Sequence, residues 1–159
     1  MTARTTPPFR ADHVGSFLRP KFLLDAREQF FVKKEISAEQ LRAVEDKAIA
    51  EIVRFQQDVG LHSITDGEFR RAYWHFDFLE GLDGVETVAA DSGMNFKGGV
   101  GIAKALKVTG RVGFSSHPML HHFRFLDAHR RPESVAKMTI PGPSMLHYRG
   151  GRKMIDRAV

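Results

Sequence analysis

The sequence predicts an α/β fold, namely the N-terminal half of a (β/α)8 barrel with parallel strands. Short apolar runs alternate with amphipathic helical segments, which is the order typical of parallel β/α units. Polar clusters follow two extended segments, at His13–Ser16 and at Asp66–Glu68, and barrel sites form at the carboxyl ends of strands. About four strand units are visible, whereas a complete barrel needs eight and typically about 250 residues. We therefore expect residues 1–159 to form a single partial barrel domain that is truncated at its C-terminus.

The composition is that of a globular protein outside the membrane. Hydrophobic residues make up 42% of the chain and charged residues 27%, which is ordinary for a soluble domain. No apolar run approaches the roughly 18 residues that a membrane helix needs, and residues 1–8 lack the apolar core of a signal peptide. We expect a cytoplasmic protein. Because the chain has no cysteine, it has no disulfide, no thiol nucleophile and no cysteine-ligated metal.

Charge is divided unevenly along the chain. Residues 1–96 hold 12 Lys and Arg against 16 Asp and Glu, whereas residues 97–159 hold 12 against 3. A basic half can bind a polyanion such as nucleic acid or a polyglutamylated cofactor. Alternatively, these bases face an acidic surface elsewhere. Nucleic acid is the less favoured partner, because the sequence has no recognised binding motif and its bases are not clustered with aromatic residues.

The first sixty residues predict an arm, an extended segment and two helices. Residues 1–9 form the arm, and the extended segment covers Phe9–Phe17. Pro20 begins a helix that continues to about Val32. Its apolar side consists of Phe22, Leu23, Ala26 and Phe30.

The second helix has the clearest signals. Ser37 and Gln40 have the spacing of a capping box, and Gly60 is well placed to end the helix. Apolar residues recur at three- and four-residue steps and predict the buried stripe: Leu41, Val44, Ala48, Ile52, Phe55 and Val59.

Shorter elements follow. We predict a strand at Leu61–Thr65, a short helix at Tyr73–Leu79 and an inserted glycine-rich hairpin excursion over residues 81–101. A third strand is expected at Ala105–Val112. Ser116 would cap a helix with Pro118 in its first turn, and a fourth strand would cover Met138–Ile140. The inner face of that last helix would consist of Leu120, Phe123 and Leu126.

Asp66 and Glu68 form the most informative pair in the chain. Alternate side chains of a strand share a face, so both carboxylates would point the same way if extended geometry continues through Gly67. Gly67 leaves room for a ligand or a second backbone. The alternative is a solvated pair that forms salt bridges with Arg70 or Arg71. A glycosidase pair is disfavoured, because its two carboxylates normally come from different strands.

Two motifs resemble the cobalamin-independent methionine synthase family. They are His13-Val14-Gly15-Ser16, with Leu18-Arg19-Pro20 after it, and Thr65-Asp66-Gly67-Glu68-Phe69-Arg70-Arg71. The resemblance is strongest to the short, single-barrel bacterial members, which are similar to that enzyme's C-terminal catalytic domain. The segments Trp74–Phe78 and Pro143–His147 fit the same members, so the similarity covers nearly the whole chain in the same order.

This resemblance implies a TIM barrel that moves a methyl group from a methylated folate to the sulfur of homocysteine, with a zinc ion activating the thiol. Val14, Gly15 and Ser16 match the turn that holds the carboxylate of the amino acid, and Glu68 matches the carboxylate that pairs with its ammonium group. Asp66 would bind substrate or orient the Glu68 loop. His13 is either a further site residue or a histidine bonded to the backbone. These six residues are the candidate substrate-binding residues.

The sequence also departs from the family. The family's zinc ligands are a histidine, two cysteines and a glutamate in the later half of the barrel, and they have no counterpart here. We therefore expect the amino-acid-binding half of the site, with no catalytic residue and no metal ligand in this chain. The methyl donor stays open, because some relatives use another one. The alternative is a non-catalytic half-barrel that binds small molecules. In either case an open sheet edge favours a homo-oligomer.

Overall fold

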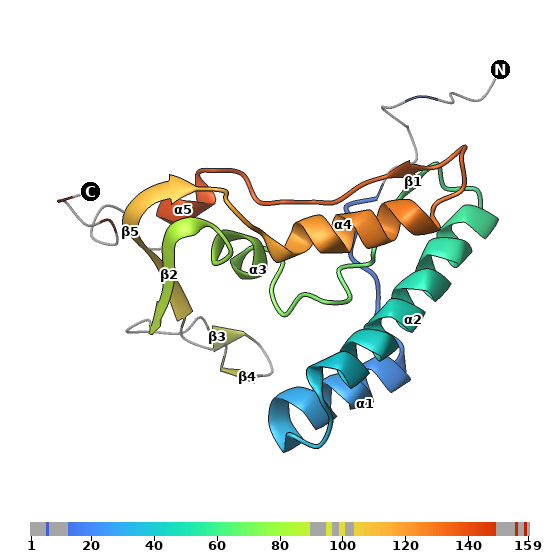
Figure 1. Cartoon of the computed structure of the whole chain (residues 1–159), viewed down its shortest axis with the longest axis horizontal. Helices are drawn as coiled ribbons and strands as arrows, with labels where there is room; N and C mark the ends of the chain where they lie inside the picture. The colour runs from blue at the N-terminus through green and yellow to red at the C-terminus, as the bar shows by residue number, and fades with distance from the viewer. Residues whose placement is uncertain are drawn as a thin grey trace. The chain divides into compact units, whose positions relative to one another are not determined.

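The computed structural model describes residues 6, 13–89, 95–96, 99–100, 104–148, 155 and 158. The chain divides into two compact units, which are residues 1–71 with 120–139 and residues 72–119 with 140–159. Figure 1 labels most of the helices and strands of both units. Most of the predicted arm, and residues 9–12 of the predicted extended segment, lie outside the described residues. No helix in the described part of the chain is long and apolar enough to span a membrane.

The first unit begins with a helix in the predicted place. Helix α1 covers Lys21–Glu28 and continues as a π-helical turn at Gln29–Lys33. Pro20 precedes the first helical residue, where its fixed φ suits a helix start and its missing N–H is not needed. Leu23 and Ala26 are buried, as the apolar pattern predicted. Lys34 ends the segment in the left-handed conformation.

Helix α2 covers Ala38–Asp58 and has the predicted capping box, in which Ser37 and Gln40 each bond to the other's backbone. Gly60 follows it with a φ of 85°, so the predicted end is also confirmed. The predicted apolar stripe is partly wrong. Phe55 and Val59 are 55% and 58% exposed. The helix is rotated relative to the prediction, so its buried residues are Leu41, Glu45, Ala48, Ile49, Val53 and Gln56.

Two short strands pair in parallel in this unit. Strand β1 covers Ser63–Ile64 and strand β6 covers Val135–Ala136. The Val135 amide donates to the His62 carbonyl at 2.7 Å, and the Lys137 amide donates to the Ile64 carbonyl at 2.8 Å. The predicted fourth strand at 138–140 is therefore wrong, since the pairing occurs earlier in the chain. The predicted parallel arrangement is confirmed for this pair.

The core of the first unit is formed by residues from both helices, β1, the loop after it and helix α4 (Pro118–His129). Leu126 of α4 is fully buried, but Leu120 and Phe123 are 41% and 38% exposed, so the predicted inner face of that helix is wrong at both positions. The residues that pack together are Leu23, Ala48, Ile49, Val53, Ile64, Phe69 and Leu126.

The second unit is built on an antiparallel pair. Strand β2 (Asp83–Ala89) pairs with β5 (Lys104–Gly113), with Val85 opposite Val108. Ala105–Val112 is therefore a strand, but not the parallel strand that we predicted. A parallel crossover usually needs a helix, and the glycine-rich sequence between these strands does not favour one. The shorter strands β3 (Asn95–Phe96) and β4 (Gly99–Val100) also pair antiparallel.

Two short helices complete the second unit. Helix α3 covers Phe76–Leu79 and helix α5 covers Met145–Tyr148. The core consists of Phe76, Leu79, Val85 and Leu106. The hairpin predicted within residues 81–101 includes residues 90–94, 97–98 and 101, which lie outside the described residues.

The start of helix α4 differs from the prediction. Helix α4 begins at Pro118, so the residue before the helix is His117 and not the predicted Ser116. The His117 Nδ1 accepts the Met119 amide at 3.1 Å. Its Nε2 therefore carries the proton and donates to the Phe78 carbonyl at 2.8 Å. The fold as described is mixed α/β with parallel strands. Half of a barrel, in one domain, stays a prediction.

Candidate functional site

The end of strand β1 is held by the side chain of Gln56, which is fully buried. Its amide nitrogen donates to the Thr65 carbonyl at 2.8 Å, and its amide oxygen accepts the Thr65 N–H at 2.9 Å. Gln56 thus satisfies Thr65 much as a neighbouring strand would. This places the polar loop that begins at Asp66 at a defined position.

The structure brings the two predicted motifs together at Thr65. The Thr65 hydroxyl donates to the Gly15 carbonyl at 2.7 Å and accepts the Gly67 amide at 3.2 Å. A backbone bond of 3.1 Å from the Phe17 amide to the Gly67 carbonyl adds a second link. The motifs are about fifty residues apart in sequence, yet they form one local structure.

The loop after Asp66 turns sharply instead of continuing the strand. Gly67 and Glu68 both have left-handed backbones, with φ of 69° and 58°. The alternation that would make Asp66 and Glu68 share a face is therefore broken. Asp66 accepts the Glu68 amide on its side chain at 3.0 Å, which fits the predicted role of orienting this loop. A left-handed glutamate is uncommon, and such strain clusters at functional sites.

The carboxylate of Glu68 is buried and has two partners. The Thr139 hydroxyl donates to its Oε1 at 2.9 Å, and Arg71 Nη1 lies 3.5 Å from the same oxygen. Arg71 also donates to the Thr139 carbonyl at 2.7 Å. An ion pair was one alternative that we predicted, but here it is buried, with 4% of the Arg71 side chain and 11% of the Glu68 side chain exposed.

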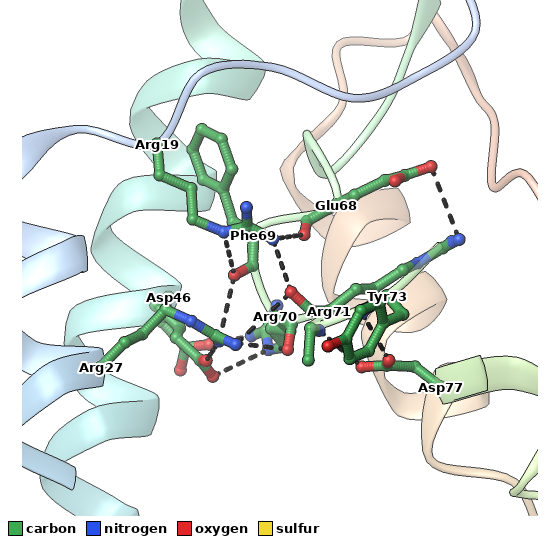
Figure 2. A network of polar contacts seen from close by, with 11 residues as sticks. Arg19, Arg27, Asp46, Glu68, Phe69, Arg70, Arg71, Tyr73 and Asp77 are labelled. Carbon is green, nitrogen blue, oxygen red and sulfur yellow. Dashed lines mark hydrogen bonds and ion pairs between the residues drawn. The ribbon is translucent and has the colours of Figure 1, made fainter. Parts of the chain in front are cut away.

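Two arginines from the segment around helix α1 hold the backbone of the Glu68 loop (Figure 2). Arg19 donates to the carbonyls of Glu68, Phe69 and Arg71 at 2.8, 3.2 and 2.5 Å. Arg27 donates to the carbonyls of Phe69, Arg70 and Arg71 at 3.2 to 3.4 Å. We call these two side chains the arginine clamp. Arg19 belongs to a motif quoted above, but nothing in the sequence indicated this contact.

A buried carboxylate anchors the clamp to helix α2. Glu45 accepts a hydrogen bond from Arg27 at 3.0 Å and lies 3.7 Å from Arg70, while Arg70 also pairs with Asp46. Burial raises the pKa of Glu45 above its ordinary value, although the positive charges of Arg70 and Arg27 act in the opposite direction. Sequence analysis missed Glu45, because a charged residue on a helix is usually exposed.

The turn at residues 13–16 approaches the Glu68 loop through Gly15. Gly15 is buried with a φ of 139°, and a Cβ there would lie 3.3 Å from the Thr139 hydroxyl. His13 is bonded to the backbone, with its Nε2 3.2 Å from the Ser63 carbonyl. Val14 is 80% exposed and Ser16 is also exposed. The structure therefore brings Gly15 close to Glu68 through Thr139 and leaves the Val14 and Ser16 side chains at the surface.

No cluster of three His, Asp or Glu side chains in the described ranges could hold a metal ion. The whole sequence also has no cysteine, so the donor set of the described residues does not fit the zinc centre that the family resemblance implies.

Known proteins are similar to most of this chain. It is 50% identical over 147 residues to YxjG, an uncharacterized protein of Bacillus subtilis (strain 168), and 47% identical over 141 residues to YxjH of the same strain. These matches cover 92% and 89% of the chain, but only 38% and 37% of the relatives. The chain therefore spans less than two fifths of their length. A methionine synthase of Sulfolobus acidocaldarius is 28% identical over 135 residues. No family model matches the sequence.

Solved structures extend the comparison. A candidate vitamin-B12-independent methionine synthase from Listeria monocytogenes is 49% identical, with a TM-score of 0.75, over 94% of this chain and 40% of that one. A B12-independent methionine synthase from Shewanella sp. W3-18-1, in complex with selenomethionine, is 22% identical with a TM-score of 0.51, over 72% of this chain and 35% of that one, and is similar in fold. These comparisons confirm the resemblance of this chain to the cobalamin-independent methionine synthase family.

Proposed function

We propose that this chain carries the amino-acid-binding half of the site of a methionine-synthase-like S-methyltransferase. Such an enzyme moves a methyl group from a methylated folate, or a related donor, to a thiol such as homocysteine. The similarity to methionine synthases supports a role of this kind. Because the chain spans about two fifths of its relatives, its own share in the proposal is binding and orienting the acceptor.

The observation that carries this proposal is the position of Glu68. Its buried carboxylate lies beside Arg71 and Thr139, and Thr139 also lines the position of Gly15. A carboxylate suits an ammonium group, whereas the backbone N–H groups of a turn and a hydroxyl suit a carboxylate. A free amino acid carries both charges on one carbon atom, so two such groups close together fit its common part.

The same loop supports the barrel proposal. Asp66 follows strand β1 within two residues, and β1 pairs in parallel with β6. Ligand sites of a TIM barrel form at the carboxyl ends of parallel strands. We therefore propose that the first unit consists of β/α units of such a barrel and that the amino acid binds at the carboxyl ends of β1 and β6. No step of methyl transfer is assigned to zinc, because the described residues do not fit that metal.

The test is calorimetric titration of the chain with L-methionine and L-homocysteine. The variant Glu68→Gln removes the charge and keeps the shape of the side chain. It should weaken ligand binding by about 2–4 kcal/mol, as expected when one partner of a desolvated charge pair is lost. Glu51→Gln is the matched control, because Glu51 is exposed on α2. Equal affinity of the wild type and Glu68→Gln for both ligands would contradict the assignment of Glu68.

A binding module without catalysis is the second candidate, because the contacts of Glu68 with Thr139 and Arg71 account for a binding site and assign no catalytic step. The two candidates differ in product formation. Incubation of the chain with homocysteine, a methylated folate and zinc, followed by measurement of methionine, separates them. We expect binding without methionine formation by this chain, and zinc-dependent methionine formation would exclude the module.

A further inference from the structure

Thr139 contacts all three parts of the candidate site. Its hydroxyl donates to Glu68 at 2.9 Å, and its carbonyl accepts from Arg71 at 2.7 Å. A Cβ added at Gly15 would lie 3.3 Å from the Thr139 hydroxyl oxygen and 3.6 Å from its methyl carbon, so the Thr139 side chain faces Gly15. Thr139 was not among the candidate site residues, because it follows β6 and lies 71 residues from Glu68 in sequence.

The contacts of the Glu68 carboxylate are one-sided. The Thr139 hydroxyl and Arg71 Nη1 both meet Oε1. Among the described residues, none donates a hydrogen bond to Oε2. A threonine hydroxyl has a single proton to donate, so this bond fixes which oxygen is occupied and leaves Oε2 for a cationic ligand.

Arg71 competes with a ligand for the Glu68 carboxylate, which makes the hydrogen bond from Thr139 to Glu68 important. A guanidinium group and a carboxylate prefer a bidentate arrangement in which both oxygens are used. Here the closest approach of Arg71 Nη1 to Glu68 is a long 3.5 Å, while another of its nitrogens is bound to the Thr139 carbonyl. Thr139 thus restrains both members of the pair, through its hydroxyl and through its carbonyl.

We propose that Thr139 is a positioning residue, which keeps Oε2 of Glu68 available to the α-ammonium group of the bound amino acid. This inference rests on the proposed function. Without the hydroxyl, the carboxylate turns toward Arg71, and the internal ion pair replaces the bond to the ligand. Thr139 therefore selects for ligands with an α-ammonium group and is neutral toward those without one.

Two substitutions isolate the hydroxyl. Thr139→Val has nearly the same shape as threonine and no hydroxyl, so its contact surface toward Gly15 is kept. Thr139→Ser keeps the hydroxyl and loses the methyl group. Each variant is titrated calorimetrically with L-methionine and with 4-(methylthio)butanoate, which is the same molecule without its amino group. Thermal unfolding of each variant records the stability of the fold.

We expect Thr139→Val to bind L-methionine about tenfold more weakly, which corresponds to the loss of one hydrogen bond to a charged group. Its affinity for 4-(methylthio)butanoate should equal that of the wild type, and Thr139→Ser should restore L-methionine binding. An unchanged affinity of Thr139→Val for L-methionine would overturn the inference. An equal loss for both probes would also overturn it, because it would indicate a merely structural role.

Glu68→Gln, titrated in parallel, separates this inference from the proposed function. If Glu68→Gln weakens L-methionine binding and Thr139→Val does not, only the inference about Thr139 is wrong. If Glu68→Gln binds L-methionine as the wild type does, the proposed role of Glu68 is wrong and the inference is overturned with it.

Discussion

The fully buried side chain of Gln56 offers a direct test of how the site is held in place. Replacing it in Gln56→Met keeps the length of the side chain and removes both of its hydrogen bonds to Thr65. A buried backbone group without a partner costs about 1–3 kcal/mol. Because the Thr65 N–H and C=O both lose their partner, we expect the free energy of unfolding to fall by about 2–6 kcal/mol. This is a large part of the 5–15 kcal/mol that typically stabilises a domain.

The assay is urea unfolding followed by far-UV circular dichroism. Gln29→Met is the matched control, because Gln29 is half-buried at the end of helix α1 and its side chain bonds to no described residue. The control should stay within about 0.5 kcal/mol of the wild type. A loss of less than about 1 kcal/mol in Gln56→Met, with an unchanged denaturant slope, would refute the reasoning, because the Thr65 backbone would then have other partners.

A charged variant adds a dependence on pH. In Gln56→Glu an ionised carboxylate can accept the Thr65 amide but cannot donate to the Thr65 carbonyl, so burial and this carbonyl raise the pKa of the new group above about 4.3. The protonated form restores both bonds. Its stabilisation is therefore present below that pH and is lost as the pH rises through the raised pKa. Gln56→Glu should approach wild-type stability in acid, and a difference from the wild type that does not change with pH would contradict this.

Four further predictions follow from other contacts. Burial raises the pKa of Glu45 above 4.5, so its stabilisation is present below that pH and declines as the pH rises through the raised value; Glu45→Gln should flatten this decline in urea titrations, and an unchanged decline would contradict it. Gly67→Ala should cost more than Gly60→Ala, because both have positive φ but only at Gly67 would a Cβ meet the Phe69 ring, at 2.8 Å; equal unfolding free energies would refute this. His117→Ala should cost about 2 kcal/mol through two lost hydrogen bonds, and an unchanged melting temperature would count against it. Among the described strands, none pairs with β6 on its side away from β1, and this edge predicts a dimer or larger assembly in light scattering; a monodisperse monomer would exclude it.

Features that depend on neighbours in sequence could be predicted. The capping box of Ser37 and Gln40 and the helix end at Gly60 involve residues within one turn of the helix. The polar loop at Asp66–Glu68 was recognised because its residue types and spacing are unusual after an apolar run. The contact of the Asp66 side chain with the Glu68 amide also spans only two residues.

Features that depend on tertiary contacts could not be predicted. Helical periodicity counts apolar residues, so it placed Phe55 inside and gave no reason to bury Gln56, whose position depends on the backbone of Thr65. The left-handed backbone of Glu68 has no signal in the sequence, because glycine and asparagine are the usual residues there. Thr139 is bonded to Glu68, which lies 71 residues away in the sequence, and no local pattern indicates a partner at that sequence separation.

The arginine clamp has a consequence for the kinetics of recognition. Arg19 and Arg27 bind the carbonyl oxygens of residues 68–71 from a separate segment of the chain, so both partners of each bond belong to the protein. The conformational entropy of ordering the loop is therefore lost when the protein folds and not when a ligand arrives. Under the proposed function, an amino acid would meet a loop that is already ordered, so we expect one-step binding whose observed rate rises in proportion to ligand concentration. We expect no slow kinetic phase from isomerisation of the loop.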